Sequence, residues 1–256
     1  MPPPSIERLY QSQHPLARLI APLLRAVGHV RRFLLQPQHR SETLTRLRHP
    51  GIHLQGATCT APDRYPELFA ACRHYLSDKP HPRVLSFGCS TGEEVFTLAQ
   101  YLPIAYITGV DLNRWCIQKA RAASPAAASH TFLLADSPAF VEAPPFDAIF
   151  CMAVLQRSEN RTHTQSIAHP GLPFRRFELQ LELLDRKLNP GGLLFLDECD
   201  FSLLDTSLAP RYRALEFSGN RVLRERPLFG PDNRLRTRDY LTDRCFLKLP
   251  GTIAST

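Results

Sequence analysis

Short apolar segments alternate with helix-length segments over nearly half of this 256-residue chain, and this alternation constrains the fold more than any other feature. Strand-length segments occupy residues 84–87, 105–110, 131–134, 146–152 and 193–196. Helix-length segments occupy residues 93–102, 113–123 and 177–188. Strands separated by helices indicate βαβ units, in which a parallel sheet is covered by helices on both faces. The sequence therefore predicts a doubly wound α/β fold.

The regions on either side have a different character. Residues 1–80 are predicted to form a helical extension, and residues 81–256 the α/β domain. Pro15 to Gln36 predicts a basic amphipathic helix interrupted at Pro22. A second helix is predicted to begin near Asp63 and to end before residues 79–82. Near the C-terminus, residues 211–225 are predicted to be helical and residues 245–249 to form a closing strand.

A glycine-containing turn joins the first strand to the first helix of the α/β region. It contains Gly88, Cys89, Ser90 and Gly92. Such a turn lets the backbone approach a ligand closely and directs free helix N–H groups toward it. Asp111 ends the second strand, 19 residues after Gly92, where a carboxylate can accept hydrogen bonds from both ribose hydroxyls. The turn, its strands and the acid together predict a nucleotide-type ligand.

The residues after the turn distinguish between nucleotide ligands. Glu93 and Glu94 open the following helix, where they would repel the pyrophosphate of a dinucleotide. S-adenosylmethionine instead brings an ammonium and a sulfonium cation, and a nearby carboxylate suits both. Acidic residues also favour helix N-termini for structural reasons alone, so a ligand contact of Glu93 remains open and one of Glu94 is less favoured. The sequence predicts S-adenosylmethionine as the cofactor.

Five landmarks between residues 83 and 205 together resemble the class I S-adenosylmethionine-dependent methyltransferases. They are the turn at residues 88–92, Asp111, the pair Asp136-Ser137, the strand 146–152 and the turn 188–195. The resemblance implies a Rossmann-like, mostly parallel seven-stranded sheet with an antiparallel C-terminal strand. The turn is also locally similar to that of the chemotaxis receptor glutamate methyltransferases, but Met152-Ala153 stands where that subgroup has Arg-Asn. The predicted cofactor-binding residues are Gly88, Cys89, Ser90, Gly92, Glu93, Asp111, Leu112, Asp136, Ser137 and Met152.

Composition narrows the class of protein. No apolar run approaches the ~18–20 residues that span a bilayer, and no signal pattern opens the chain, so a cytoplasmic enzyme without stable membrane insertion is expected. None of the seven cysteines forms a C-x-x-C pair, and no metal site is expected. Residues 83–205 hold 10 basic and 14 acidic side chains, a net charge of −4, so the rest of the chain carries +11 and the total net charge is +7. A basic flank could attract nucleic acid, but 27 arginines against four lysines also fit a codon bias, and no specific nucleic-acid binding is expected.

The methyl acceptor is less constrained than the cofactor. Because a sulfonium is a good leaving group, in-line positioning of the acceptor can suffice, and a base is needed only if the acceptor must lose a proton. A small-molecule acceptor is the first expectation. The alternative acceptors are a protein carboxylate or RNA. A further alternative is that the chain binds the cofactor without transferring its methyl group. The sequence predicts neither a catalytic residue nor an oligomeric state. Candidates for a general base follow strands four and five, although each is expected to be a solvated loop residue. They are Gln156, Arg157, Glu159, His163, Asp197, Glu198 and Asp200.

The N-terminal helices are expected to cover the acceptor side of the pocket as a lid. The apolar stripe of Pro15 to Gln36 must be buried against something, and the ligand crevice of an open α/β sheet lies at the carboxyl ends of its strands. A sheet face, a dimer partner or a membrane surface are competing placements for the same stripe.

Overall fold

A computed structural model describes residues 15–49, 61–125, 129–161 and 165–250, and side chains from residue 20 onward. The chain divides into two compact units, residues 1–49 and 50–256. The first unit contains the helices α2 (Pro15–Leu35) and α3 (Pro37–Arg48). No helix in the described part of the chain has the length and apolar character that a membrane crossing requires.

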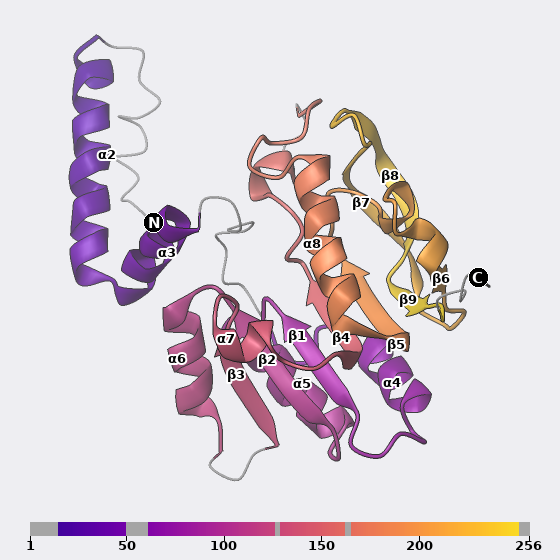
Figure 1. Cartoon of the computed structure of the whole chain (residues 1–256). Helices are drawn as coiled ribbons and strands as arrows, with labels where there is room; N and C mark the ends of the chain where they lie inside the picture. Colours follow the sequence, from indigo (N-terminus) through magenta and orange to yellow (C-terminus); the bar gives the residue numbers. More distant parts are fainter. Residues whose placement is uncertain (1–14, 50–60, 126–128, 162–164, 251–256) are drawn as a thin grey trace. The chain divides into compact units, whose positions relative to one another are not determined.

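The second unit is built on a seven-stranded sheet (Figure 1). The strand order is β3-β2-β1-β4-β5-β9-β6. The strands are β1 (Arg83–Phe87), β2 (Tyr106–Asp111), β3 (His130–Leu134), β4 (Phe146–Met152), β5 (Leu188–Asp197), β6 (Tyr212–Ala214) and β9 (Cys245–Lys248). The first five pair in parallel, and β9 runs antiparallel to both β5 and β6. The predicted Rossmann-like sheet with an antiparallel C-terminal strand is confirmed.

Helices cover both faces of this sheet, as the alternation of strands and helices predicted (Figure 1). They are α4 (Pro66–Tyr75), α5 (Glu93–Tyr101), α6 (Arg114–Ala123), α7 (Pro138–Val141) and α8 (Phe174–Lys187). On one face α8 packs Phe177 and Leu181 against Leu85 and Leu194 of the sheet. On the other face α4 and α5 bury Phe69 and their other apolar side chains against the alternate residues of the same strands. This two-sided burial explains why the strands are apolar throughout.

The N-terminal boundary differs from the predicted one. Leu68, Phe69 and Cys72 of α4 are fully buried in the core of the second unit, so α4 belongs to the α/β fold and the division falls at His49. Within the first unit, α2 continues through Pro22, contrary to the predicted interruption. A proline removes one backbone donor, and the residues on both sides of Pro22 sustain the helix.

The predicted helix over residues 211–225 is wrong. These residues contribute β6 and the start of β7 (Arg221–Phe229), which forms an antiparallel hairpin with β8 (Leu235–Asp243). Short 3-10 turns at Ser158–Arg161, Leu203–Asp205 and Ala209–Arg211 lie in the connecting loops. Strand pairing decided this region, since β6 completes the sheet edge beside β9 and β7 pairs with β8. Such pairing depends on distant partners, which local periodicity does not report.

Candidate functional site

The turn between β1 and α5 has an unusual backbone conformation. Gly88, Ser90 and Gly92 have positive φ angles of 80°, 50° and 100°. The amides of Gly88 and Cys89 donate to the carbonyl oxygen of Val110 at 2.7 and 3.0 Å. A Cβ on Gly88 would lie 2.4 Å from Cγ2 of Val154, so only glycine fits between this turn and the loop after β4. The turn therefore packs closely against the loop after β4 at the carboxyl end of β1.

Asp111 holds this turn against the end of β2. Its Oδ2 accepts a hydrogen bond from the Ser90 amide at 2.9 Å, and its Oδ1 accepts one from the Asn113 amide at 2.7 Å. Burial raises the pKa of the Asp111 carboxyl, although the backbone amides that donate to it oppose the shift. The predicted ribose-binding acid is thus also a structural tie between the turn and β2.

The two acids that open α5 have different surroundings. The Glu93 carboxylate accepts a hydrogen bond from the Thr91 hydroxyl at 2.8 Å and stays half-buried at the turn. The Glu94 carboxyl instead accepts a 2.7 Å hydrogen bond from the Ser86 hydroxyl of β1. Burial raises the pKa of Glu94 to about 7, against opposing contributions from Ser86 and Arg64. Of the two, Glu93 is therefore the better placed for a cationic ligand.

The other predicted cofactor residues lie at the same edge of the sheet. Cys89 is buried, Leu112 is half-buried and Asp136 is exposed after β3. The Ser137 hydroxyl donates to the carbonyl oxygen of Leu134 at 2.6 Å and caps α7, so it is engaged within its own turn. Met152 ends β4 and is buried. Parallel pairing brings these positions together, since the carboxyl ends of β1, β2, β3 and β4 form one rim.

The acids after β5 are not the solvated loop residues that the sequence suggested. Asp197 is buried, is bound by the Arg224 guanidinium, and lies 3.5 Å from Nη1 of Arg244. Asp200 is fully buried and accepts hydrogen bonds from Nη2 of Arg226 at 2.9 Å and from the side-chain Nδ2 of Asn160 at 2.6 Å. No metal-binding group of three or more His, Cys, Asp or Glu residues occurs in the described ranges. These acids anchor the β7–β8 hairpin.

Glu198 belongs to the same ionic layer, by which we mean the ion pairs between Asp197, Glu198 and Asp200 and the arginines around them. It has a φ of 55°, and its Oε2 accepts from Arg161 at 2.8 Å and from Arg226 at 3.2 Å. Gln156 is buried and accepts from the same two arginines. Arg157 pairs with Glu159 at 2.7 Å. His163 lies outside the described residues.

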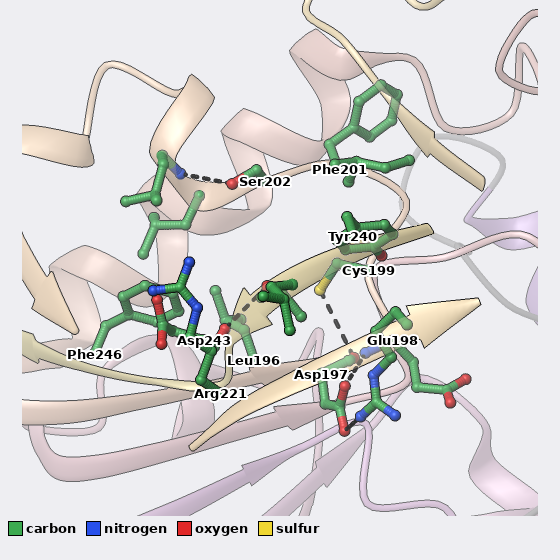
Figure 2. Close-up of a pocket in the computed structure, with 16 residues that line it drawn as sticks. Leu196, Asp197, Glu198, Cys199, Phe201, Ser202, Arg221, Tyr240, Asp243 and Phe246 are labelled. Atoms are coloured by element: carbon green, nitrogen blue, oxygen red, sulfur yellow. Dashed lines mark hydrogen bonds and ion pairs between the residues drawn. The ribbon is translucent and has the colours of Figure 1, made fainter. Parts of the chain in front are cut away.

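Two cavities adjoin the hairpin and share Glu198 and Arg224 in their walls. The smaller has a volume of about 150 Å³, with Tyr240 and Cys199 at one end and Phe246 and Asp243 at the other (Figure 2). The larger has a volume of about 680 Å³. Its wall comprises Arg161, Glu198, Leu223, Arg224, Glu225, Arg226, Pro227, Arg238 and Asp239. Most residues of this wall are charged, and the larger cavity lies beside the loops that follow β4 and β5.

Comparison with known proteins identifies the family. A methyltransferase domain matches residues 61–229, about two thirds of the chain. The chain belongs to this family of methyltransferases. S-adenosylmethionine is accordingly its cofactor. No curated protein matches the chain.

Solved structures similar to this methyltransferase are distant. One is the plantazolicin methyltransferase BpumL in complex with SAH, with 19% identity over 66% of this chain and 56% of that chain, and a TM-score of 0.39. PKMT2 from Rickettsia typhi has 22% identity over 50% of this chain and 24% of that chain, with a TM-score of 0.36. An S-adenosylmethionine-dependent methyltransferase from Mesorhizobium loti has 22% identity over 49% of this chain and 50% of that chain, with a TM-score of 0.32. The chain thus spans about half the length of the first of these proteins.

The rim of the methyltransferase sheet is chemically compatible with the cofactor. Asp111 accepts backbone hydrogen bonds from Ser90, Leu112 and Asn113, and since a carboxylate has about four acceptor sites, one remains that a ribose hydroxyl can use. Gly88 itself packs against Val154 of the loop after β4, which fixes the turn in place beside the ends of β1 and β4. Glu93 supplies a carboxylate for a cationic group. The turn therefore suits a cation rather than a pyrophosphate.

Sequence reasoning missed the hairpin of this methyltransferase. Arg224 and Arg226 alternate along β7 and both reach buried acids after β5. Tyr240 pairs opposite Arg224 on β8 and lines the smaller cavity. Residues 221–226 show no alternation of apolar and polar residues that could have predicted this strand; the period of two appears only in the structure, where Arg221, Leu223 and Glu225 are exposed.

Proposed function

We propose that this methyltransferase binds its cofactor across the rim formed by β1, β2, β3 and β4. Asp111 would hold the ribose hydroxyls, the turn from Gly88 to Gly92 would lie against the methionine end, and Glu93 would face the ammonium group. Asp136 and Leu112 would border the adenine, and Met152 the methyl group. The positive φ angles of the turn and the position of Asp111 beside it support this placement.

The acceptor in this proposal is a small polar molecule that occupies the cavity beside the β7–β8 hairpin. A volume of about 680 Å³ is in the range of small-molecule sites, roughly 300–1,000 Å³. Arg161 and Glu198 of its wall follow β4 and β5, whose carboxyl ends adjoin the cofactor rim. A wall that presents guanidinium and carboxylate groups favours an acceptor with charged or hydrogen-bonding groups. This cavity is the observation that carries the proposal.

The chain's residues would act mainly by positioning in this proposal. When bound, the cofactor supplies an activated methyl group on its sulfonium. The ion pairs of Asp197 with Arg224 and of Asp200 with Arg226 hold the hairpin wall in place, so that the acceptor meets the methyl group in line. Glu198 is the carboxylate of the cavity wall that follows β5, and it would receive a proton if the acceptor must lose one.

Transfer from S-adenosylmethionine with a labelled methyl group tests the acceptor class. The purified chain is incubated with small-molecule, protein and RNA fractions, and the label is expected in the small-molecule fraction. Label confined to protein as a base-labile ester, or confined to RNA, would replace the small acceptor. Cofactor binding without transfer to any fraction would favour a binding protein.

Two neighbouring arginines of β8 provide a matched test of the cavity. Arg238 lines the cavity, whereas the Arg236 guanidinium pairs with Asp205 at 2.9 Å. Arg238→Ala should raise the KM for the acceptor severalfold and leave the cofactor Kd unchanged. Arg236→Ala should change neither quantity. Equal kinetic effects of the two substitutions would exclude this cavity as the acceptor site.

A further inference from the structure

The helix α2 carries a stripe of large apolar side chains that are exposed to solvent. Leu23 and Leu34 are each 66% exposed, and Val27 and Val30 are 58% and 55% exposed. Ile20 and Leu24 are exposed to a smaller degree. Monomeric soluble proteins seldom expose a continuous apolar patch of this kind, so the stripe indicates an interaction surface.

The spacing of the stripe is that of a helix that packs lengthwise against another helix. Ile20, Leu23, Val27, Val30 and Leu34 follow each other at intervals of three and four residues, a mean period of 3.5. In heptad terms, Ile20, Val27 and Leu34 occupy a positions, while Leu23 and Val30 occupy d positions. Ile20 and Val27 at a positions, with Leu23 at a d position, fit the pattern that favours a parallel pair of helices, whereas Val30 and Leu34 depart from it. The a and d positions together form the seam, which is short. Leu24, at an e position, widens the apolar stripe and adds to the apolar area that a partner could bury.

The arginines of α2 do not all lie away from this stripe. Arg25 and Arg32 fall at f positions, on the opposite side of the helix, whereas Arg31 falls at an e position beside Val30. In a parallel pair of helices an e position faces a g position of the partner, which is Ala26 here, so Arg31 meets no like charge across the interface.

The contact between α2 and α3 uses a different side of α2. Nε2 of His39 lies 3.2 Å from Nδ1 of His29, and the two rings meet edge to face with centroids 4.9 Å apart. His29 is at a c position, off the seam. The helical hairpin thus forms while the apolar stripe remains available.

The size of the stripe matches what a dimer requires. The six exposed apolar side chains from Ile20 to Leu34, at roughly 100 Å² each, give about 600 Å² per partner, which is at the lower end of specific interfaces. A stripe on one helix is self-complementary about a two-fold axis, as an isologous homodimer requires. We infer that a second copy of this chain packs its α2 in parallel against this stripe. The sequence alone suggested a lid over the same protein's pocket, but the heptad spacing and the self-complementary stripe favour the copy.

Two variants that introduce the same carboxylate on opposite sides of α2 test this inference in the full chain. Sedimentation equilibrium at micromolar concentration should give the mass of a dimer for the parent protein. Val27→Glu places a charge in the seam and should raise the dimer dissociation constant at least a hundredfold. Arg25→Glu, on the outer side, should leave the dimer intact. Unchanged circular dichroism would show that both variants fold.

Cysteine substitutions test the parallel orientation. In a parallel pair the a position at the end of the stripe faces its own copy, so Leu34→Cys should form a disulfide with its copy under mild oxidation. In an antiparallel pair the two copies of residue 34 would lie at opposite ends, and Leu34→Cys, like Arg25→Cys and the parent in either case, should not cross-link. A monomeric parent protein, or equal masses for Val27→Glu and Arg25→Glu, would overturn the inference. A monomer in which Val27→Glu abolishes transfer but preserves cofactor affinity would overturn it in favour of the lid. A monomer whose binding to anionic phosphatidylserine vesicles depends on Val27 would overturn it in favour of a lipid surface.

Discussion

Replacing Glu94 with Gln should change how the stability of this methyltransferase depends on pH. The Glu94 carboxyl accepts a 2.7 Å hydrogen bond from the Ser86 hydroxyl beneath the cofactor turn. Burial raises its pKa from 4.5 to about 7, because removal from water penalises the charged form. Glutamine has the same shape, and its amide oxygen can accept the same hydrogen bond, but it carries no charge at any pH.

The sign of the effect follows from the raised pKa. Between pH 4.5 and about 7 the folded protein keeps the Glu94 proton while the unfolded chain releases it. The contribution of Glu94 to the free energy of unfolding is therefore greatest below pH 4.5 and falls as the pH rises. Because one pKa unit corresponds to about 1.4 kcal/mol, this pKa shift lowers the free energy of unfolding of the parent protein by an amount on the order of 3 kcal/mol above pH 7. Glu94→Gln lacks this loss. The free energy of unfolding of the variant minus that of the parent should therefore increase by up to about 3 kcal/mol between pH 4.5 and pH 8.

Urea unfolding of the parent protein and the variant at several pH values measures this difference. The comparison of two proteins cancels the titration of all other groups, and any constant offset from the amide does not alter the slope. Glu93→Gln is the matched control, and because it keeps Glu94 it should retain the pH dependence of the parent. A difference between the parent and Glu94→Gln that stays constant with pH would refute the reasoning.

Three further substitutions test the rim and the hairpin. Asp111→Ala should weaken S-adenosylmethionine binding at least tenfold in calorimetry, because it removes charge-assisted hydrogen bonds worth about 1.5–3 kcal/mol each; an unchanged Kd would contradict the assignment. Gly88→Ala should destabilise the fold by about 1–2 kcal/mol or more, given its φ of 80° and the 2.4 Å approach to Val154, and the added change Val154→Ala should restore part of the loss in thermal denaturation. Asp200→Asn should lower the free energy of unfolding by about 3 kcal/mol in urea, since Arg226 would lose its buried partner; a change below about 1 kcal/mol would show that the pair does not anchor the hairpin.

The sequence alone was sufficient to predict the α/β core. The strands β1 to β5 and the helices between them appear as apolar segments of two lengths, because burial on both faces leaves a local pattern in composition. The cofactor turn was predictable for the same kind of reason, since Gly88 and Gly92 adopt backbone conformations that other residues rarely take.

Other features depend on residues far apart in the chain. Asp197 and Asp200 look like loop acids until β7 brings Arg224 and Arg226 to them, and α4 looks like part of an N-terminal extension until Phe69 is found in the core. In the same way, Glu93 and Glu94 are identical residues at neighbouring positions in the sequence. Their hydrogen-bond partners differ only in the folded structure, where Ser86 donates to Glu94 and Thr91 donates to Glu93. Local patterns record whether a residue is buried, whereas its partner depends on how distant segments meet. The contacts between distant segments depend on the whole fold. For this reason the ionic layer and the adjoining cavities became visible only in the structure.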